Sequence, residues 1–121
     1  MTNRDNLKQF GAHEKTLALF DLVVADLVPL ANNSILYRLI AQQLASADSI
    51  AANIEEGYGR GSRKDYAHFL IIARGSAQET CGRYERLKHW LPPTTIDARV
   101  ALCGEIIGIL SSTIKTLREQ D

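Results

Sequence analysis

The chain has 121 residues, of which 45% are apolar, and its 14 lysines and arginines balance its 14 aspartates and glutamates. This length suits a single domain spanning residues 1–121, and the apolar content suits a packed core rather than a disordered segment. Because the net charge is zero, bulk charge predicts neither a polyanion-binding protein nor an acidic tail protein.

Four amphipathic segments follow one another along the chain, and each repeats apolar residues at steps of three and four, which predicts helices. Pro29 ends the first, because the residue before a proline is pushed out of helical geometry. Ser62 and Asp65 form a capping-box pattern that opens the third, and Pro92 and Pro93 end it. The sequence therefore predicts an all-α, antiparallel up-down-up-down four-helix bundle. Its helices are expected over residues 13–29, 33–58, 63–91 and 95–119.

Three glycines at positions 57, 59 and 61 separate the second and third predicted helices. Glycine-rich loops that hold phosphates usually follow a strand, whereas a helix comes before this one. A helix-to-helix turn is the better interpretation. We expect Gly57 or Gly59 to end the second helix with a positive φ angle.

The fourth predicted helix is unusually apolar for a helix that faces water. Between Val100 and Ile114 its only charged residue is Glu105. A small bundle can bury one side of such a helix, so the other side is expected to meet a second copy of the chain. The residues predicted for this interface between subunits are Leu102, Ile106 and Ile109.

Polar residues form one line on the second helix and another on the third, and both lines approach the glycine turn. The carboxylates of Glu56 and Glu79 suggest acid–base or metal chemistry. A di-iron bundle, however, needs two Glu-x-x-His motifs, and Asp65-x-x-His68 is the nearest pattern present. A structural hydrogen-bonded network is therefore the favoured interpretation. Its predicted members are Asn53, Glu56, Arg60, Arg74, Ser76 and Glu79.

Basic residues are densest at the turn between the second and third helices. Between Arg60 and Lys88 there are seven positive and three negative side chains, a net charge of +4. Arg60, Arg63 and Lys64 lie at the start of a helix, where the helix dipole disfavours cations, which suggests that an anion binds there. Contact with RNA or DNA through these three residues is therefore an alternative function.

No arrangement of residues in the sequence indicates a catalytic centre, a metal site or a cofactor. Cys81 and Cys103 have no metal-binding or redox spacing, and both fall on apolar helical positions. Reduced, buried thiols are expected, which fits a cytoplasmic protein. The first ten residues contain no apolar signal region and no run of eighteen apolar residues occurs, so neither secretion nor a membrane span is predicted.

Two strings stand out in the middle of the chain, SIAANIEEGYGR at residues 49–60 and FLIIARGSAQE at residues 69–79. Together they resemble the signature of a known family, the 23S rRNA-intervening sequence proteins. The first string contains Glu55, where that family usually has alanine, and a helix end should tolerate the difference. The resemblance spans about thirty residues, and the predicted architecture extends it over most of the chain.

This resemblance implies a closed antiparallel bundle that assembles as a ring of five subunits. It implies no enzymatic activity and no cofactor. It also implies a role in association with RNA or with a partner that processes nucleic acid. The neutral net charge of this chain makes the basic surface weaker than such a role requires. A self-assembling interaction module is thus the first hypothesis from the sequence, and a nucleic-acid-binding protein is the second.

Overall fold

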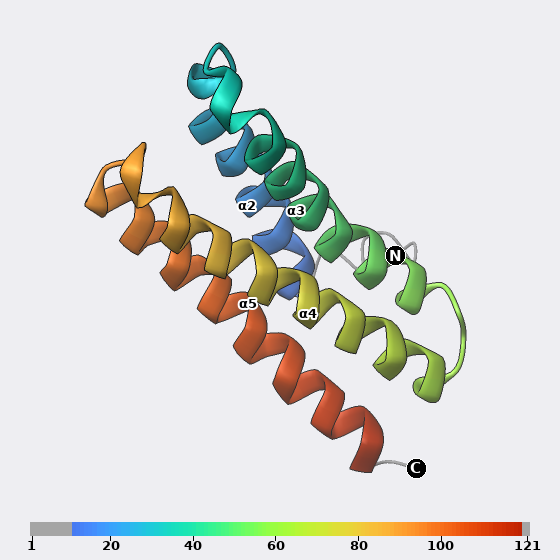
Figure 1. Cartoon of the computed structure of the whole chain (residues 1–121). Coiled ribbons are helices and arrows are strands. Elements are labelled where there is room, and N and C mark those ends of the chain that lie inside the picture. Colours follow the sequence, from blue (N-terminus) through green and yellow to red (C-terminus); the bar gives the residue numbers. More distant parts are fainter. Residues whose placement is uncertain (1–10, 120–121) are drawn as a thin grey trace.

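A computed structural model describes residues 11–119 of the chain. Over this range the secondary structure is entirely helical, with four long helices and three short 3-10 helices. Successive long helices run in opposite directions, as Figure 1 shows, so the predicted all-α up-down bundle is confirmed. The long helices are α2 (Gly11–Leu27), α3 (Tyr37–Tyr58), α4 (Arg63–Arg86) and α5 (Pro93–Glu119), and the short ones are η1 (Val28–Leu30), η2 (Ser34–Leu36) and η3 (Leu87–His89).

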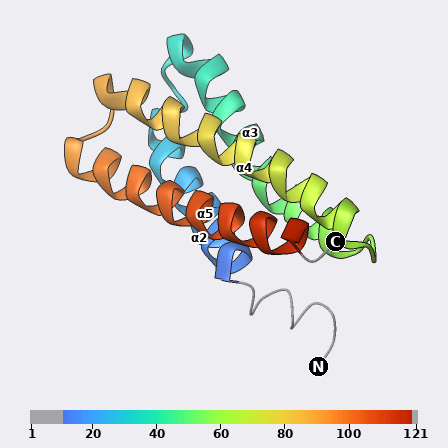
Figure 2. The same cartoon turned by 90° about the horizontal axis from the view of Figure 1, so that it is seen from below.

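The connections between helices divide the bundle into two ends. The α2–α3 and α4–α5 connections lie at one end, and the α3–α4 turn lies at the other (Figures 1 and 2). Each helix packs against its neighbours in the sequence, and α2 also packs against α5, which closes the bundle. In both views α3 and α4 lie side by side at their turn and diverge toward the opposite end.

The core lies between the four helices, and its members come from the apolar stripes of all four. The stripes bury one face of each helix because residues three and four apart share a side of the helix. Ten side chains at its centre are no more than 1% exposed: Leu19, Val23, Ile50, Ile54, Leu70, Ala73, Ala77, Cys103, Ile106 and Leu110.

All four helices differ from the predicted ones at one end or both, and α3 begins at Tyr37 rather than at residue 33 because Ser34–Leu36 form η2. α2 stops at Leu27, and Pro29 lies inside the 3-10 helix that follows. α4 stops at Arg86, and the chain tightens into η3 before the prolines. α5 begins at Pro93, two residues earlier than predicted. A proline suits the first helical position, because no N–H donor is needed there and the fixed φ of proline is already close to the helical value.

The glycine turn also differs in detail. Gly57 lies inside α3, and Gly59 has a φ of −79°, so the predicted positive φ at one of these two residues is wrong. The residue with positive φ is Gly61, at 82°. Gly57 is instead required by close packing, because a Cβ atom there would lie only 2.7 Å from Phe69 Cβ. Ser62 caps α4 as predicted, and its Oγ accepts a 3.1 Å hydrogen bond from the Asp65 N–H.

Candidate functional site

A buried polar cluster joins α3 to α4 in the half of the bundle away from the glycine turn. The Gln43 side chain donates to the Thr80 carbonyl at 2.9 Å, and the Ser46 and Thr80 hydroxyls lie 2.8 Å apart. Arg83 Nη1 donates to Gln43 Oε1 at 2.9 Å and to Ser46 Oγ at 3.0 Å. All four residues are at least nine-tenths buried. Buried polar groups are costly without partners, so this cluster fixes the register of α3 against α4.

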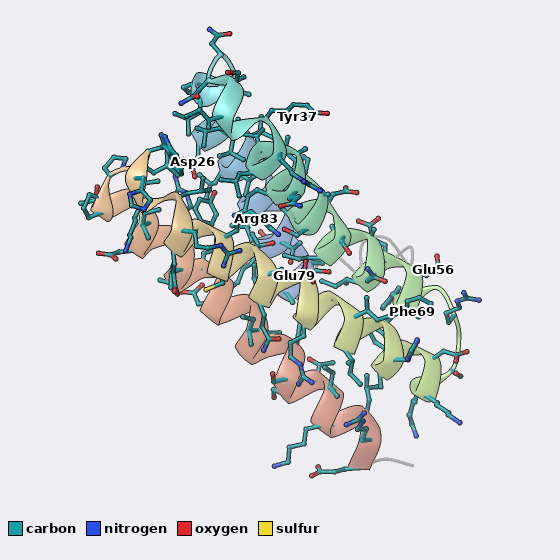
Figure 3. The ribbon with its side chains drawn as sticks, viewed as in Figure 1. Asp26, Tyr37, Glu56, Phe69, Glu79 and Arg83 are labelled. Atoms are coloured by element: carbon teal, nitrogen blue, oxygen red, sulfur yellow. The ribbon has the colours of Figure 1, made fainter. Side chains whose placement is uncertain are left out.

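Arg83 is the unusual member of this cluster, because its guanidinium is buried at the α3–α4 junction and no carboxylate among residues 11–119 hydrogen-bonds to it. Figure 3 shows its side chain between the two helices. Burial lowers the pKa of Arg83, the nearby charge of Arg86 lowers it further, and Glu79 acts in the opposite direction. The Nε atom of Arg83 is buried and has no hydrogen-bond partner among the described residues.

The residues of the predicted network do not form a single cluster. Asn53 and Ser76 meet through Ser49, whose hydroxyl contacts Asn53 Nδ2 at 3.0 Å and Ser76 Oγ at 2.9 Å. Arg74 instead reaches across to α5, where it donates to Ser111 Oγ at 3.3 Å. Asn53 and Ser76 therefore belong to the α3–α4 junction, while Arg74 belongs to the α4–α5 junction.

The two glutamates of that prediction point toward solvent. Glu56 pairs with Arg60 at 3.0 Å, one turn along the same stretch of chain, and both side chains are about half exposed. Glu79 is exposed and makes no hydrogen bond or ion pair within residues 11–119. Residues three apart share a side of a helix, so both glutamates lie at the exposed edge of the side that carries Asn53 and Ser76, not inside the junction. Glu56 and Glu79 thus do not form the buried carboxylate pair that acid–base chemistry would need.

A second buried polar cluster joins α2, α4 and α5, and the sequence pattern did not predict it. The Arg99 side chain donates to both carboxylate oxygens of Asp26, at 2.8 and 3.1 Å, and the Tyr84 hydroxyl donates to Asp26 at 2.7 Å. Burial, followed by the hydrogen bond to Asp26, raises the pKa of Tyr84 well above its ordinary value. Tyr84 lies on the apolar stripe of α4, so its position alone indicated only a core residue.

The basic turn is partly neutralised by its surroundings. Besides its ion pair with Glu56, Arg60 places its guanidinium carbon 5.1 Å from the centre of the Phe69 ring, a cation–π contact. Arg63 and Lys64 are both exposed at the start of α4. Lys64, His68 and Arg118 together line a surface hollow of about 350 Å³ between α4 and the end of α5.

One residue of the predicted interface is misplaced. Ile106 is completely buried in the core of the single chain, so it cannot contact a neighbour there. Leu102 and Ile109 are half-buried at the edges of the same helix. The apolar arc of α5 spans more than one face, and packing against α2 and α4 turned Ile106 inward. Exposed apolar side chains lie instead along one side of α2 and η1, at Leu17 (40%), Val24 (36%) and Val28 (64%).

The profile of the 23S rRNA-intervening sequence protein family matches residues 11–112. The chain belongs to this family. A solved structure from Bacteroides thetaiotaomicron, described as a protein with unknown function from the S23 ribosomal protein family, is similar to it with a TM-score of 0.79 and 29% identity. The match covers 86% of this chain and 95% of the other. No curated protein matches.

The two signature strings that resemble the 23S rRNA-intervening sequence proteins lie on α3 and α4, on either side of the glycine turn. They contain Ser49, Asn53 and Ser76, which hydrogen-bond at the α3–α4 junction, and Gly57, whose backbone packs closely against Phe69. Glu55, the departure from the usual alanine, accepts a 2.8 Å hydrogen bond from His13 of α2, or pairs with it when the ring is charged. In this member of the family Glu55 therefore connects the end of α3 to α2 through His13.

Two further observations concern metal and membrane. Within the described residues no group of three or more His, Cys, Asp or Glu side chains is placed to hold a metal ion. α5 is long and apolar enough to span a membrane by length and composition alone. One such helix is weak evidence, because the core helix of a bundle has the same composition, and α5 buries Cys103, Ile106 and Leu110 in this one.

Proposed function

We propose that this 23S rRNA-intervening sequence protein is a non-catalytic module that assembles with copies of itself. The observation that carries the proposal is the apolar outer row of α2 and η1, Leu17, Val24 and Val28, which no other part of residues 11–119 covers. Several exposed apolar side chains on one side of a helix suggest an interface, although Asp21 lies between Leu17 and Val24.

The outer side of α5 offers a complementary surface on the same chain. It carries Gly104 and Gly108, where an added Cβ would meet nothing within 4 Å, so another backbone can approach closely. A hollow of about 470 Å³ lies beside them, lined partly by Ile109 and by the ion pair of Lys15 with Glu105. Only 22% of the most apolar eighteen-residue stretch of α5 is buried within the chain.

These two surfaces suit a head-to-tail contact, in which the α2 row of one copy packs on the outer side of α5 of the next. A contact between two different surfaces closes into a ring when the rotation between subunits permits it. The α2 surface also exposes Glu14 and Asp21, and the outer side of α5 exposes Lys115, so the charges are complementary. Five subunits is the number that the family resemblance implies.

The test is multi-angle light scattering of the purified protein at micromolar concentration. We expect a mass near five times the 13.4 kDa of one chain. Replacing Leu17 and Val24 with glutamate should lower the mass toward 13.4 kDa while the helical circular dichroism is retained. The matched control is Ile72→Glu on α4, because Ile72 is as exposed as Leu17, at 40%. A monomeric parent protein, or dissociation by Ile72→Glu alone, would contradict the proposal.

A second candidate function is binding of RNA or DNA at the basic turn. The hollow between Lys64, His68 and Arg118 favours it, because a cation from the end of α5 joins the turn there. Arg63 supplies further charge, while Arg60 is already engaged with Glu56. Anisotropy of a labelled oligonucleotide at low salt tests this: binding should weaken steeply with salt and be lost when Arg60, Arg63 and Lys64 are all alanine. No binding at low salt leaves self-assembly alone.

The cytoplasm is the compartment that we propose. Both cysteines are free thiols in the structure, although Cys81 of α4 and Cys103 of α5 lie close enough to share a hydrogen bond. Free thiols so near each other suit a reducing compartment, since oxidising compartments favour disulfides.

The absence of a catalytic role is likewise a proposal. It is supported by the exposed positions of Glu56 and Glu79, the carboxylates that the sequence offered for acid–base chemistry.

A further inference from the structure

Both cysteines of the chain lie at the junction of α4 and α5. The Cys103 side chain is completely buried in the core, and the half-buried Cys81 side chain packs against that core. The two thiols lie close enough to share a hydrogen bond. Because the chain has no other cysteine, each thiol has one possible partner within it.

Hydrogen bonds on both sides of this pair hold α4 and α5 in register. Toward the glycine turn, Arg74 of α4 donates to Ser111 of α5 at 3.3 Å. Toward the opposite end, Tyr84 of α4 and Arg99 of α5 donate to the same carboxylate of α2. Each cysteine lies between the two contact residues of its own helix. The antiparallel register of the two helices therefore sets the thiols opposite each other.

We propose that Cys81 and Cys103 form an oxidation site, at which a hydroperoxide converts the two thiols into a disulfide that links α4 to α5. The proposal is independent of self-assembly and of nucleic-acid binding. Cys81 is the thiol that solvent reaches, so it is the one that meets the oxidant. Cys103 is buried beside it and supplies the second sulfur.

The reaction takes two steps. In the first, the Cys81 thiol loses its proton and its sulfur attacks an oxygen of the hydroperoxide. An S–O bond forms and the O–O bond breaks, which leaves a sulfenic acid on Cys81 and releases water or an alcohol. In the second, the Cys103 sulfur attacks the Cys81 sulfur, and the S–O bond breaks as its oxygen leaves with the Cys103 proton as water. The two thiols lose two electrons in all, and the hydroperoxide accepts them.

The first step should be slow at neutral pH. Burial and the charge of Glu85 raise the pKa of Cys81, and the hydrogen bond with Cys103 acts in the opposite direction. The thiolate is the nucleophile, so a raised pKa leaves few molecules ready to react. A pair of this kind stays reduced in a reducing compartment and responds to sustained rather than brief exposure to peroxide.

Mass spectrometry of the full chain tests the site. The reduced protein is incubated with hydrogen peroxide at neutral pH, its remaining thiols are alkylated, and it is digested with trypsin without reduction. Because trypsin cuts after lysine and arginine, Cys81 falls in the peptide of residues 75–83 and Cys103 in that of residues 100–115. We expect these two peptides to be joined within one chain, and dithiothreitol should separate them. Oxygen addition to Cys81 with no joined peptides, or joining only between two copies of the chain, would overturn the proposal.

Single variants assign the two roles. In Cys103→Ala the sulfenic acid of Cys81 has no thiol to react with, so dimedone should label Cys81 after peroxide is added. Cys81→Ala leaves only the buried thiol, and peroxide should oxidise it about tenfold or more slowly than it oxidises the parent chain. An unlabelled Cys81 in the first variant, or oxidation of Cys103 at the parent rate in a folded second variant, would contradict these roles.

A third variant changes the reaction rate and leaves both thiols in place. Glu85→Gln removes the negative charge one turn after Cys81, so it should speed disulfide formation about two- to threefold. The matched control is Glu14→Gln, the same change at an exposed glutamate of α2, and it should react at the parent rate. An unchanged or lower rate in Glu85→Gln would contradict the assignment of Cys81 as the thiol that reacts first.

Discussion

The Tyr84 hydroxyl donates a 2.7 Å hydrogen bond to Asp26, and this bond joins the last turn of α4 to the last turn of α2. Arg99 of α5 holds the same carboxylate from another side through two hydrogen bonds. Three helices therefore meet at one aspartate. Its side chain is only 9% exposed and that of Arg99 is 18% exposed, so each group depends on the others for its hydrogen bonds.

Asp26→Ala should lower the free energy of unfolding by about 3 kcal/mol, because it leaves the Arg99 charge and the Tyr84 hydroxyl buried without their acceptor. Tyr84→Phe removes one hydrogen bond and keeps the ion pair, so it should lower stability by about 1 kcal/mol. Urea denaturation at a fixed protein concentration measures both. A smaller loss for Asp26→Ala than for Tyr84→Phe would show that the ion pair contributes nothing.

Glu56→Ala should change the free energy of unfolding by no more than about 0.5 kcal/mol. Its ion pair with Arg60 joins two half-exposed side chains four residues apart, and such surface pairs contribute little. This expectation replaces the larger loss that a buried Glu56 would have produced. The same urea experiment checks it. A loss of several kcal/mol would mean that another chain buries Glu56, since nothing in residues 11–119 does.

Alanine substitutions should separate the three glycines of the turn. Gly57→Ala should destabilise by about 1–3 kcal/mol, because the new Cβ would overlap Phe69. Gly61→Ala should cost about 1–2 kcal/mol through its positive φ, with no clash. Gly59→Ala is the control, because it has helical angles and its Cβ would meet only ordinary contacts at 3.7 Å, so it should stay within about 0.5 kcal/mol. Thermal or urea unfolding of the three variants would contradict this account if Gly59→Ala proved the most damaging.

Stability should fall in alkaline solution, and Cys103 should account for part of the fall. Burial raises the pKa of this thiol from 9.0 to about 12, and the nearby Cys81 adds to the effect. Above pH 9 the unfolded chain releases this proton while the folded chain keeps it, so the folded state binds more protons. The contribution of the Cys103 thiol to the free energy of unfolding is thus fully present below pH 9 and is lost as the pH rises toward 12.

Urea denaturation from pH 8 to 11 measures this loss. Cys103→Ala should flatten the decline by up to about 1.4 kcal/mol per pH unit. Tyr66, whose pKa burial raises to about 12, contributes equally in both proteins. Parallel curves for the parent protein and the variant would show that the thiol does not titrate in this range.

The helices could be predicted from the sequence because their signals are local. The step of three and four residues, the capping serine at position 62 and the prolines each act within a few positions. The rotation of α5 about its axis could not be predicted in this way. Leu102, Ile106 and Ile109 all lie on a wide apolar arc, and only packing against other helices decided that Ile106 points into the core.

The candidate sites were harder to predict, because they depend on which residues of distant helices face each other. Arg83 meets Gln43, 40 residues away in the sequence, and Asp26 meets Arg99, 73 residues away. A polar row at Gln43, Ser46 and Ser49, spaced by three on an otherwise amphipathic helix, was the one signal for the first cluster. The lines of polar residues in the sequence indicated the α3–α4 junction, but they did not indicate which side chains face inward. The predicted hydrogen-bonded network therefore wrongly included Glu56 and Glu79.

The tight turn at residues 59–62 has a consequence for how the chain folds. It brings α3 and α4 together after closing a very short loop, whereas the contact of Lys15 with Glu105 spans 90 residues. Closing a short loop loses little chain entropy, so the α3–α4 hairpin should form first and α2 should dock last. Under native conditions α2 should therefore open most readily, and its amide hydrogens should exchange with solvent sooner than those of α3 and α4.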